Sequence, residues 1–261
     1  MLKNTLSLDE IKKIELDILK FIDKTCAENH LKYFLAYGTL LGAIRHNGFI
    51  PWDDDIDIYM LREDYEKLIK ILGNRQDDRY KLLHLTTDPN YYYEFAKIVD
   101  SNTEIEVPNV IKNPAEGIWV DIFPLDKVAS CKRLQHVVIN ALVGCRALSV
   151  YTKFPSNRRS KLFYPLWIIS KAIGPRFFLN IIERICKSGK SNKYLGAIAA
   201  VGGSYYYPTE YFSSEIKVPF EDMICPAPIE YKRYLEGEYG DYMQLPPEDK
   251  RVCHPMESYL K

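Results

Sequence analysis

Aspartates and apolar residues follow one another between Asp53 and Met60, and this segment limits the possible folds of the chain more than any other. Alternation of this kind indicates a strand with one buried face. Because the side chains of a strand point to opposite faces in turn, Asp53, Asp55 and Asp57 are expected on one face, and the isoleucines beside them on the other, in the core. Three carboxylates on one face repel one another, so we expect a cation to bind between them.

A further acid, Asp121, lies in an apolar stretch with the sequence GIWVDIFP, from Gly117 to Pro124. This stretch predicts a buried strand that Pro124 closes. Burial of a lone carboxylate is costly unless the group is paired or binds a metal. We therefore expect Asp121 on a neighbouring strand, where it would complete a site for a hard divalent cation with Asp55 and Asp57. Mg²⁺, or alternatively Mn²⁺, suits such oxygen ligands.

The alternative to a metal site is a solvated acidic turn, which is the commoner setting of aspartate-rich segments. The alternation from Asp53 onward, and the position of Asp121 inside a hydrophobic strand, favour the metal site. An EF-hand is excluded, because no glycine and glutamate stand at the offsets that its calcium loop requires.

A glycine and a threonine, Gly38 and Thr39, lie between a predicted strand and a predicted short helix. A glycine at a strand end lets the backbone approach a phosphate, and the N–H groups at the start of a helix attract an anion. The acids follow about sixteen residues downstream. Together these features predict a phosphate held between backbone amides and a metal, the arrangement of phosphoryl transfer.

Two basic residues and one acid are further candidates for substrate binding. Arg45 ends the short helix, and its planar guanidinium suits phosphate oxygens, although an ordinary surface position explains it equally well. Lys97 lies in a predicted strand; on the site face, which we favour over a solvated face, it would neutralise a diphosphate. Asp53 is expected to contact the substrate. Asp121, or Asp53 through water, is the expected general base.

The rest of the chain predicts an α+β fold with a small mixed sheet flanked by helices and a helical basic insertion. We expect a catalytic core over 1–126, a basic helical region over 127–209 and a C-terminal segment over 210–261 that packs back on the core. Beyond residue 215, mostly loops are expected. The expected helices cover 8–28, 39–45, 62–72, much of 130–190 and a short piece near 229–235, and the expected strands cover 33–37, 53–60, 80–85, 93–99 and 117–123.

The net charge is zero, from 35 basic and 35 acidic residues, and gives no indication of nucleic-acid binding. The charge is unevenly distributed, because residues 127–209 carry fourteen basic residues and one acid, Glu183, a net charge of +13. Apolar runs at 162–169 and 177–182 lie among these basic residues. This pattern is equally typical of a helix on an anionic membrane and of a solvated basic face over a helical core.

We find neither a signal peptide nor a stretch of apolar residues long enough to span a bilayer. The six cysteines are widely spaced without a CxxC pair, so free thiols are expected, with a structural zinc site as the less favoured alternative. These observations predict a cytoplasmic protein. It would be peripheral at the inner face of the plasma membrane if the basic region binds lipid.

Residues 37–58, with the sequence YGTLLGAIRHNGFIPWDDDIDI, resemble the signature of the LicD family, which is related to fukutin and fukutin-related protein. The resemblance covers most of the chain, and residues 130–205 are its least diagnostic part. It continues in WVDIFPLD at 119–126, YGDYM at 239–243, the prolines at 246–247, and His254.

The resemblance implies a nucleotidyltransferase-like fold and assigns roles to the residues that match the family motif. Gly38 and Thr39 match its Gly-Ser/Thr motif. Asp55 and Asp57 match the paired acids that bind Mg²⁺, and Asp121 matches the third acid. The cysteine cluster that binds zinc in fukutin-related protein has no counterpart in this sequence.

The resemblance also implies an activity: transfer of a phosphorylated alcohol from a CDP-linked donor, first of all phosphocholine from CDP-choline. The expected acceptor is a sugar hydroxyl of a lipid-linked cell-surface glycan such as teichoic acid or lipopolysaccharide. Ribitol phosphate from CDP-ribitol is the alternative transferred group. Two other classes stay open: a true nucleotidyltransferase, which uses the same acids, and a non-catalytic binding module, which the presence of all three acids disfavours.

Overall fold

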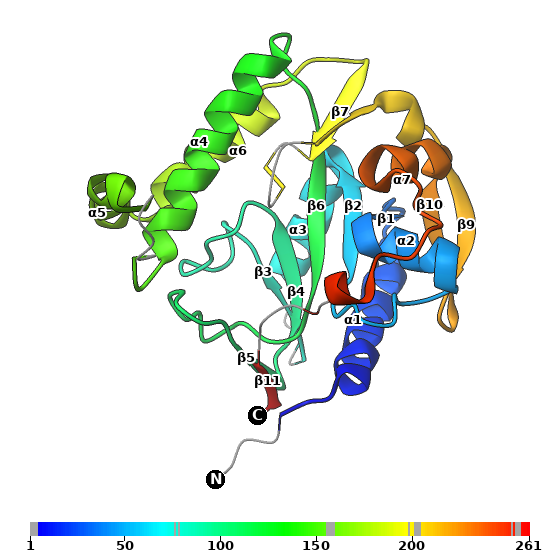
Figure 1. Ribbon diagram of the computed structural model, residues 1–261. Helices are drawn as coiled ribbons and strands as arrows, with labels where there is room; N and C mark the ends of the chain where they lie inside the picture. Colours follow the sequence, from blue (N-terminus) through cyan, green and yellow to red (C-terminus); the bar gives the residue numbers. More distant parts are fainter. Residues whose placement is uncertain are drawn as a thin grey trace.

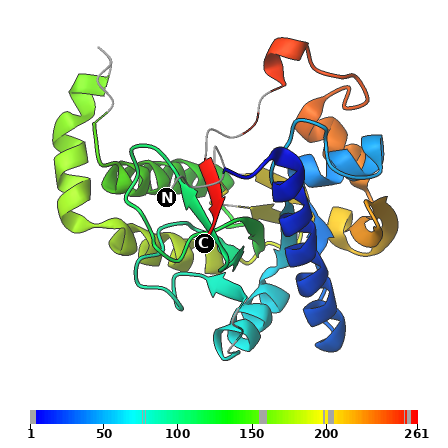
Figure 2. The ribbon, with the colours of Figure 1, turned by 90° about the horizontal axis from the view of Figure 1, so that it is seen from below.

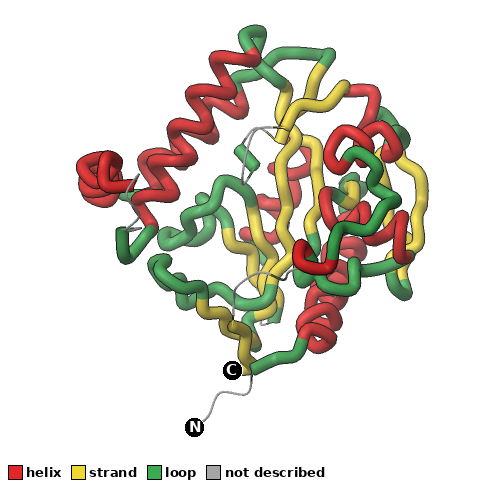
Figure 3. The backbone as a smooth tube through the Cα atoms, in the orientation of Figure 1, coloured by secondary structure: helices red, strands yellow, loops and turns green. Residues whose placement is uncertain are grey.

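The computed structural model describes residues 5–75, 77, 79–154, 160–197, 199–200, 205–251, 253 and 257–261 (Figure 1). A mixed sheet with strand order β1-β2-β6-β4-β3 lies at its centre, and β7 and β8 extend the sheet from the end of β6. Figure 3 shows these strands with helices around them, which confirms the expected α+β class. The strands of the sheet are β1 (Phe34–Leu35), β2 (Asp57–Leu61), β3 (Tyr80–Leu83), β4 (Ala96–Asp100), β6 (Trp119–Lys127), β7 (Tyr194–Ala197) and β8 (Tyr205–Pro208).

The middle of the sheet is the parallel pair β2–β6, whereas the other strand pairs of the sheet are antiparallel. Side chains alternate between the two faces along both central strands. Ile58, Val120 and Ile122 are fully buried in the main core. Asp57 and Asp121 therefore point to the face opposite these three side chains, as the alternation predicted, and Tyr59 and Phe123 share that face with them.

Helices α1 (Leu8–Glu28) and α3 (Arg62–Gly73) pack against the sheet, and Figure 2 shows both on the lower side of the molecule. A capping box begins α1, because Ser7 and Glu10 each accept a hydrogen bond from the other's backbone N–H. Both helices confirm the expected ranges to within a residue. A third helix, α2 (Tyr37–His46), begins two residues earlier than expected and packs against β2 and β9 (Glu215–Phe220).

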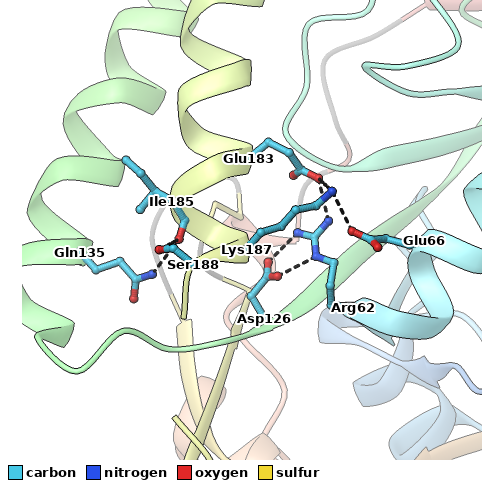
Figure 4. A network of polar contacts seen from close by, with 8 residues as sticks. All are labelled: Arg62, Glu66, Asp126, Gln135, Glu183, Ile185, Lys187 and Ser188. Atoms are coloured by element: carbon cyan, nitrogen blue, oxygen red, sulfur yellow. Dashed lines mark hydrogen bonds and ion pairs between the residues drawn. The ribbon is translucent and has the colours of Figure 1, made fainter. Parts of the chain in front are cut away.

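The basic region contains three packed helices, which confirms the expected helices within 130–190. A polar network fixes α6 to the sheet and to α3 (Figure 4). The Arg62 guanidinium binds both carboxylate oxygens of Asp126 at 2.7 Å and Glu183 at 3.0 Å, while Lys187 contacts Glu183 at 3.0 Å and Glu66 at 2.7 Å. The elements of this region are α4 (Lys132–Val150), η1 (Ser160–Phe163), α5 (Tyr164–Ile173) and α6 (Pro175–Lys187).

The C-terminal part contains a β-hairpin where mostly loops were expected, so that expectation is wrong. Strands β9 (Glu215–Phe220) and β10 (Met223–Pro228) pair antiparallel. Prolines at 219, 226 and 228 obscured the hairpin in the sequence; they are tolerated because a two-stranded hairpin consists of edge strands. The remaining elements are η2 (Thr209–Phe212), α7 (Tyr231–Tyr239), η3 (Glu248–Lys250) and the antiparallel pair β5 (Thr103–Glu106) and β11 (Glu257–Leu260).

The acidic segment, residues 53–57, is mostly a loop, and the expected strand from Asp53 is wrong at its start. The backbone N–H of Asp53 donates to the carbonyl of Ile50 in a turn, at 3.0 Å. Ladder pairing with β6 begins only at Asp57. Strand alternation therefore determines the direction of Asp57, but it does not place Asp53 and Asp55.

Other strand boundaries differ from expectation too: β3 ends at Leu83, β4 begins at Ala96 and β6 begins at Trp119. Two more differences have a physical reason. β1 ends at Leu35, because Tyr37 has a φ of +40° and already belongs to α2. β6 does not end at Pro124 but continues to Lys127. The backbone N–H groups of a strand point in turn to its two neighbouring strands. The N–H of Asp121 points to β2, so the backbone at position 124 points to the β4 side, where pairing has already ended at Ile122. The missing N–H of Pro124 therefore costs no ladder bond.

Candidate active site

Asp57 and Asp121 are direct neighbours in register across the parallel strands β2 and β6. Both side chains are buried. Burial raises the pKa of Asp57 well above its ordinary range, and the negative charges of Asp55, Asp121 and Asp53 raise it further, while Lys97 lowers it. Asp53, Asp55, Asp57 and Asp121, which we call the acid cluster, are therefore near enough for their charges to act on one another. The two buried members, Asp57 and Asp121, lie where water solvates charge poorly.

Lys97 provides positive charge in contact with the acid cluster. It lies opposite Asp121 in the antiparallel pair β4–β6, and its Nζ is 2.8 Å from Oδ1 of Asp121. The ammonium also lies 3.9 Å from the centre of the Trp119 ring and 4.8 Å from that of Tyr93. Aromatic faces favour a desolvated cation, so this buried side chain has the rings and Asp121 as partners in place of solvent.

The start of α2 holds the acidic segment in place. A Cβ atom on Gly38 would lie 2.7 Å from Oδ2 of Asp53, so a glycine is needed for this carboxylate to approach the helix. The Oγ1 of Thr39 accepts a 2.8 Å hydrogen bond from the backbone N–H of Asp57. A helix N-terminus favours an anion. The carboxylate of Asp53 lies close to this N-terminus, and a phosphate bound there stays a prediction.

Glu15 is a buried acid near the acid cluster. The sequence patterns did not single it out. It is 1% exposed, and its Oε2 has no hydrogen-bond partner among the residues that the structure describes. Burial raises its pKa well above the ordinary 4.5, and the carboxylates of residues 53–57 raise it further. The burial of Glu15 could have been predicted from the sequence. The residue lies between Ile11 and Ile18 on the apolar stripe of α1, where a charged side chain is unusual.

The substitution Glu15→Gln is expected to stabilise the folded chain by about 1–3 kcal/mol at pH 7, because it replaces a costly buried carboxylate with a neutral amide. Since the pKa of Glu15 is raised in the folded state, the parent and variant should differ little below pH 4.5, where this group is protonated in both states. As the pH rises above 4.5, the unfolded parent ionises first and the parent loses stability relative to the variant. Urea unfolding at pH 4.5 and pH 7, in the presence of a chelator, measures this difference.

The matched control is Glu28→Gln, at the exposed end of the same helix, which should change the unfolding free energy by less than about 0.5 kcal/mol at both pH values. A stabilisation by Glu15→Gln that is the same at both pH values would contradict the raised pKa.

A cleft of about 750 Å³ opens between α2 and the segment 239–251. Arg45 lies in it and donates from Nη1 to the backbone carbonyl of Tyr242 at 3.0 Å, so it orders one wall of the cleft. Trp52, which directly precedes the acidic segment, carries the guanidinium of Arg251 over its ring at 5.0 Å. The polar and aromatic lining residues are Arg45, Trp52, Tyr239, Asp241, Tyr242, Gln244, Glu248 and Arg251.

The cleft lies close to the acid cluster. Trp52 lines the cleft, and the next residue in the chain is Asp53 of the acid cluster. A ligand in the cleft can therefore carry one group against the aromatic rings while another group approaches the acids. His254, which belongs to the sequence resemblance, lies outside the described residues.

The donor set fits a hard divalent cation in its chemistry. Among the described residues, no three His, Cys, Asp or Glu side chains are grouped closely enough to form a complete ligand set as they stand. Asp57 and Asp121 are nevertheless carboxylates on directly paired strands, and the raised pKa of Asp57 indicates negative charge that Lys97 balances only in part. Mg²⁺ or Mn²⁺ would be held by these two residues, and Asp55 as the third ligand stays a prediction.

The structure thus brings most of the expected site residues together. Asp57 and Lys97 are the register neighbours of Asp121, and the charges of Asp53 and Asp55 act on Asp57. Gly38 lies beside Asp53, and Thr39 bonds to the backbone of Asp57. Arg45 lies apart from them, in the cleft. The six cysteines are free, as expected.

Comparisons with known proteins identify relatives of this chain. Residues 30–142, which include α2, the acidic segment and β6, match the LicD/FKTN/FKRP nucleotidyltransferase domain. Over 98% of its length the chain is 30% identical to the lipopolysaccharide cholinephosphotransferase LicD of Haemophilus influenzae, and it covers 98% of that protein. Over 47% of its length it is 32% identical to an uncharacterised protein of Rickettsia prowazekii, of which it covers 46%. The match of nearly the whole chain, together with the domain match, shows that this protein belongs to the LicD family.

Proposed function

We propose that this protein transfers phosphocholine from CDP-choline to a sugar hydroxyl of a lipopolysaccharide-type glycan. The observation that carries the proposal is the 30% identity along 98% of the chain to a lipopolysaccharide cholinephosphotransferase. The in-register pair Asp57 and Asp121 supports it, because adjoining carboxylates suit the metal-assisted displacement at phosphorus that such a transfer needs. A lipid-linked acceptor would place the enzyme at the cytoplasmic face of a membrane.

In this proposal the acceptor hydroxyl attacks the phosphorus of phosphocholine, the bond from that phosphorus to CMP breaks, and CMP leaves. A divalent cation held by Asp57, Asp121 and Asp55 would neutralise the diphosphate and stabilise the charge on the departing CMP. Thr39 fixes the backbone of Asp57, and Lys97 orients Asp121 through their ion pair. Asp121, or Asp53 through water, accepts the proton that the hydroxyl releases.

The cleft offers a place for the choline group of the donor. Trp52, Tyr239 and Tyr242 provide aromatic faces there, and Asp241 and Glu248 provide negative charge. A quaternary ammonium cannot donate hydrogen bonds, so aromatic faces and nearby carboxylates are the means by which proteins bind it. In this arrangement choline would displace the guanidinium of Arg251 from the Trp52 ring.

The variant Trp52→Ala is expected to weaken the binding of CDP-choline about tenfold, a loss of ~1.4 kcal/mol, because the cation–π contact with the indole is removed. The binding of CMP, which has no choline group, should change less than about twofold. Calorimetric titration of both ligands measures the two dissociation constants. An equal loss of affinity for CDP-choline and CMP would place the choline group elsewhere.

The transferred group is tested by product mass after incubation of the protein, Mg²⁺ and a glycan acceptor with CDP-choline, CDP-ribitol or CTP in separate reactions. Addition of phosphocholine to the acceptor, with release of CMP, is the expected outcome. Addition of ribitol phosphate would identify CDP-ribitol as the donor in place of CDP-choline. Addition of a nucleotide would identify a true nucleotidyltransferase. An acceptor that stays unmodified in all three reactions would favour a binding module.

A further inference from the structure

The helix α5 exposes an unusually apolar surface. Its one buried side chain is a serine, Ser170. The adjoining Leu162 is 83% exposed, Ile169 is 55% exposed and Ile168 is 50% exposed. Figure 1 shows α5 at the margin of the molecule, beyond the end of α4 and away from the sheet. The other exposed apolar side chains around it are Phe163, Tyr164, Leu166, Ile173 and Phe177.

The distribution of side chains around α5 is the reverse of that in an ordinary surface helix. At about 100° per residue, Ile168 lies opposite Ser170, Tyr164 is also turned away from it, and Ile169 lies to the side. A surface helix usually buries its apolar side and exposes its polar side. Here the apolar side faces outward, so the fold itself provides no partner for it among the residues that the structure describes.

The next helix, α6, shows that this exposure is specific to α5. Apolar residues fill both segments of the sequence. In α6, however, Phe178, Leu179 and Ile182 are buried. The sequence left open either a membrane-binding helix or a helix with an ordinary core face. The second describes α6, whose apolar side is buried, but not α5.

The charge around α5 is positive. Lys153, Lys171 and Arg176 are exposed beside it. Glu183, the only acid between 127 and 209, is bound to Arg62 and Lys187 in the network that fixes α6, so its charge is already compensated. Apolar side chains framed by lysine and arginine suit an anionic lipid surface.

Aromatic side chains extend this surface on one flank of α5. The rings of Phe154, Tyr164 and Trp167 contact one another, with centroids 5.4–5.5 Å apart. Tryptophan and tyrosine are enriched where proteins meet the headgroup region of a bilayer. A second copy of the chain is a poorer partner, because a symmetric contact would bring the same basic residues together.

We propose that α5, with Leu162 and Phe163 before it, binds the surface of an anionic bilayer and holds the enzyme there in a peripheral manner. Among the described residues, no helix is both long and apolar enough to cross a membrane. The contact is therefore interfacial, with Ile168 and Ile169 entering the acyl boundary and Lys171 and Arg176 contacting anionic headgroups. This inference does not depend on which group the enzyme transfers.

Flotation of the protein with vesicles tests the proposal. The parent chain should float with vesicles of phosphatidylethanolamine and phosphatidylglycerol, and much less with phosphatidylcholine vesicles or at high salt. The double variant Ile168→Glu with Ile169→Glu should lower the partition coefficient at least about tenfold, because two charges replace the inserted side chains. The pair Lys171→Glu with Arg176→Glu should lower binding to the anionic vesicles only.

The matched control is Leu134→Glu with Val137→Glu, since both side chains are exposed on α4, at 61% and 58%. This pair should float like the parent, and all three double variants should elute like the folded parent in gel filtration. Failure of the parent to float with anionic vesicles would overturn the proposal, as would an equal loss of binding in the control pair. A dimer of the parent that Ile168→Glu with Ile169→Glu separates would also overturn it, by assigning the face to a second copy.

Discussion

The variant Asp57→Asn is expected to lose turnover on the order of 10³-fold, since loss of one group that stabilises charge in a transition state has an effect of this size. The amide keeps the shape of the side chain but removes the charge that would bind the metal. Because burial and the neighbouring acids raise the pKa of Asp57, its ionised form destabilises the fold. The variant should therefore unfold at the parental temperature or above it when no divalent cation is present. CMP release and thermal unfolding measure the two effects.

The control for this variant is Asp222→Asn, which removes an exposed carboxylate paired with Lys20. It should keep parental turnover. Mg²⁺ should raise the unfolding temperature of the parent and of this control by mass action, but not that of Asp57→Asn. Parental turnover of Asp57→Asn in the presence of Mg²⁺ would contradict the role of the acid cluster.

The direction of both acids could be predicted from the sequence because it depends on local patterns, whereas the pairing of their strands joins distant segments. Apolar neighbours required both Asp57 and Asp121 to lie in buried strands, and alternation turned both away from the core. The start of the first strand could not be predicted in this way. It depends on the turn in which Asp53 bonds to Ile50 and on the partner strand, which reaches only as far back as Asp57.

Other features also could not be predicted, because they depend on contacts between segments that are distant in the sequence. The cleft forms where Arg45 of α2 meets the carbonyl of Tyr242, almost two hundred residues later in the chain. The outward apolar side of α5 also needs the packing of its neighbours to be known, because composition alone does not distinguish it from α6. Glu15 is the exception, since its place on the apolar stripe of α1 was visible in the sequence.

The variant Lys97→Met is expected to lower the free energy of unfolding by about 3–5 kcal/mol in the presence of a chelator, because it removes one partner of a buried ion pair and leaves the other charged. Asp121, whose Oδ1 lies 2.8 Å from the ammonium, is that partner. The double variant with Asp121→Asn should recover much of the loss, since it carries no uncompensated carboxylate at this position. Urea unfolding of the parent, the two single variants and the double variant measures the coupling.

The same experiment tests whether a cation binds at the cluster. If Mg²⁺ is held by Asp57 and Asp121, it supplies the positive charge that Lys97→Met removes, so the loss of stability should be smaller with Mg²⁺ than with a chelator. The control Lys81→Met, on the neighbouring strand β3 with an exposed side chain, should cost less than about 0.5 kcal/mol in both conditions. A loss for Lys97→Met that Mg²⁺ leaves unchanged would mean that the lysine, and not a metal, is the counter-charge of these aspartates.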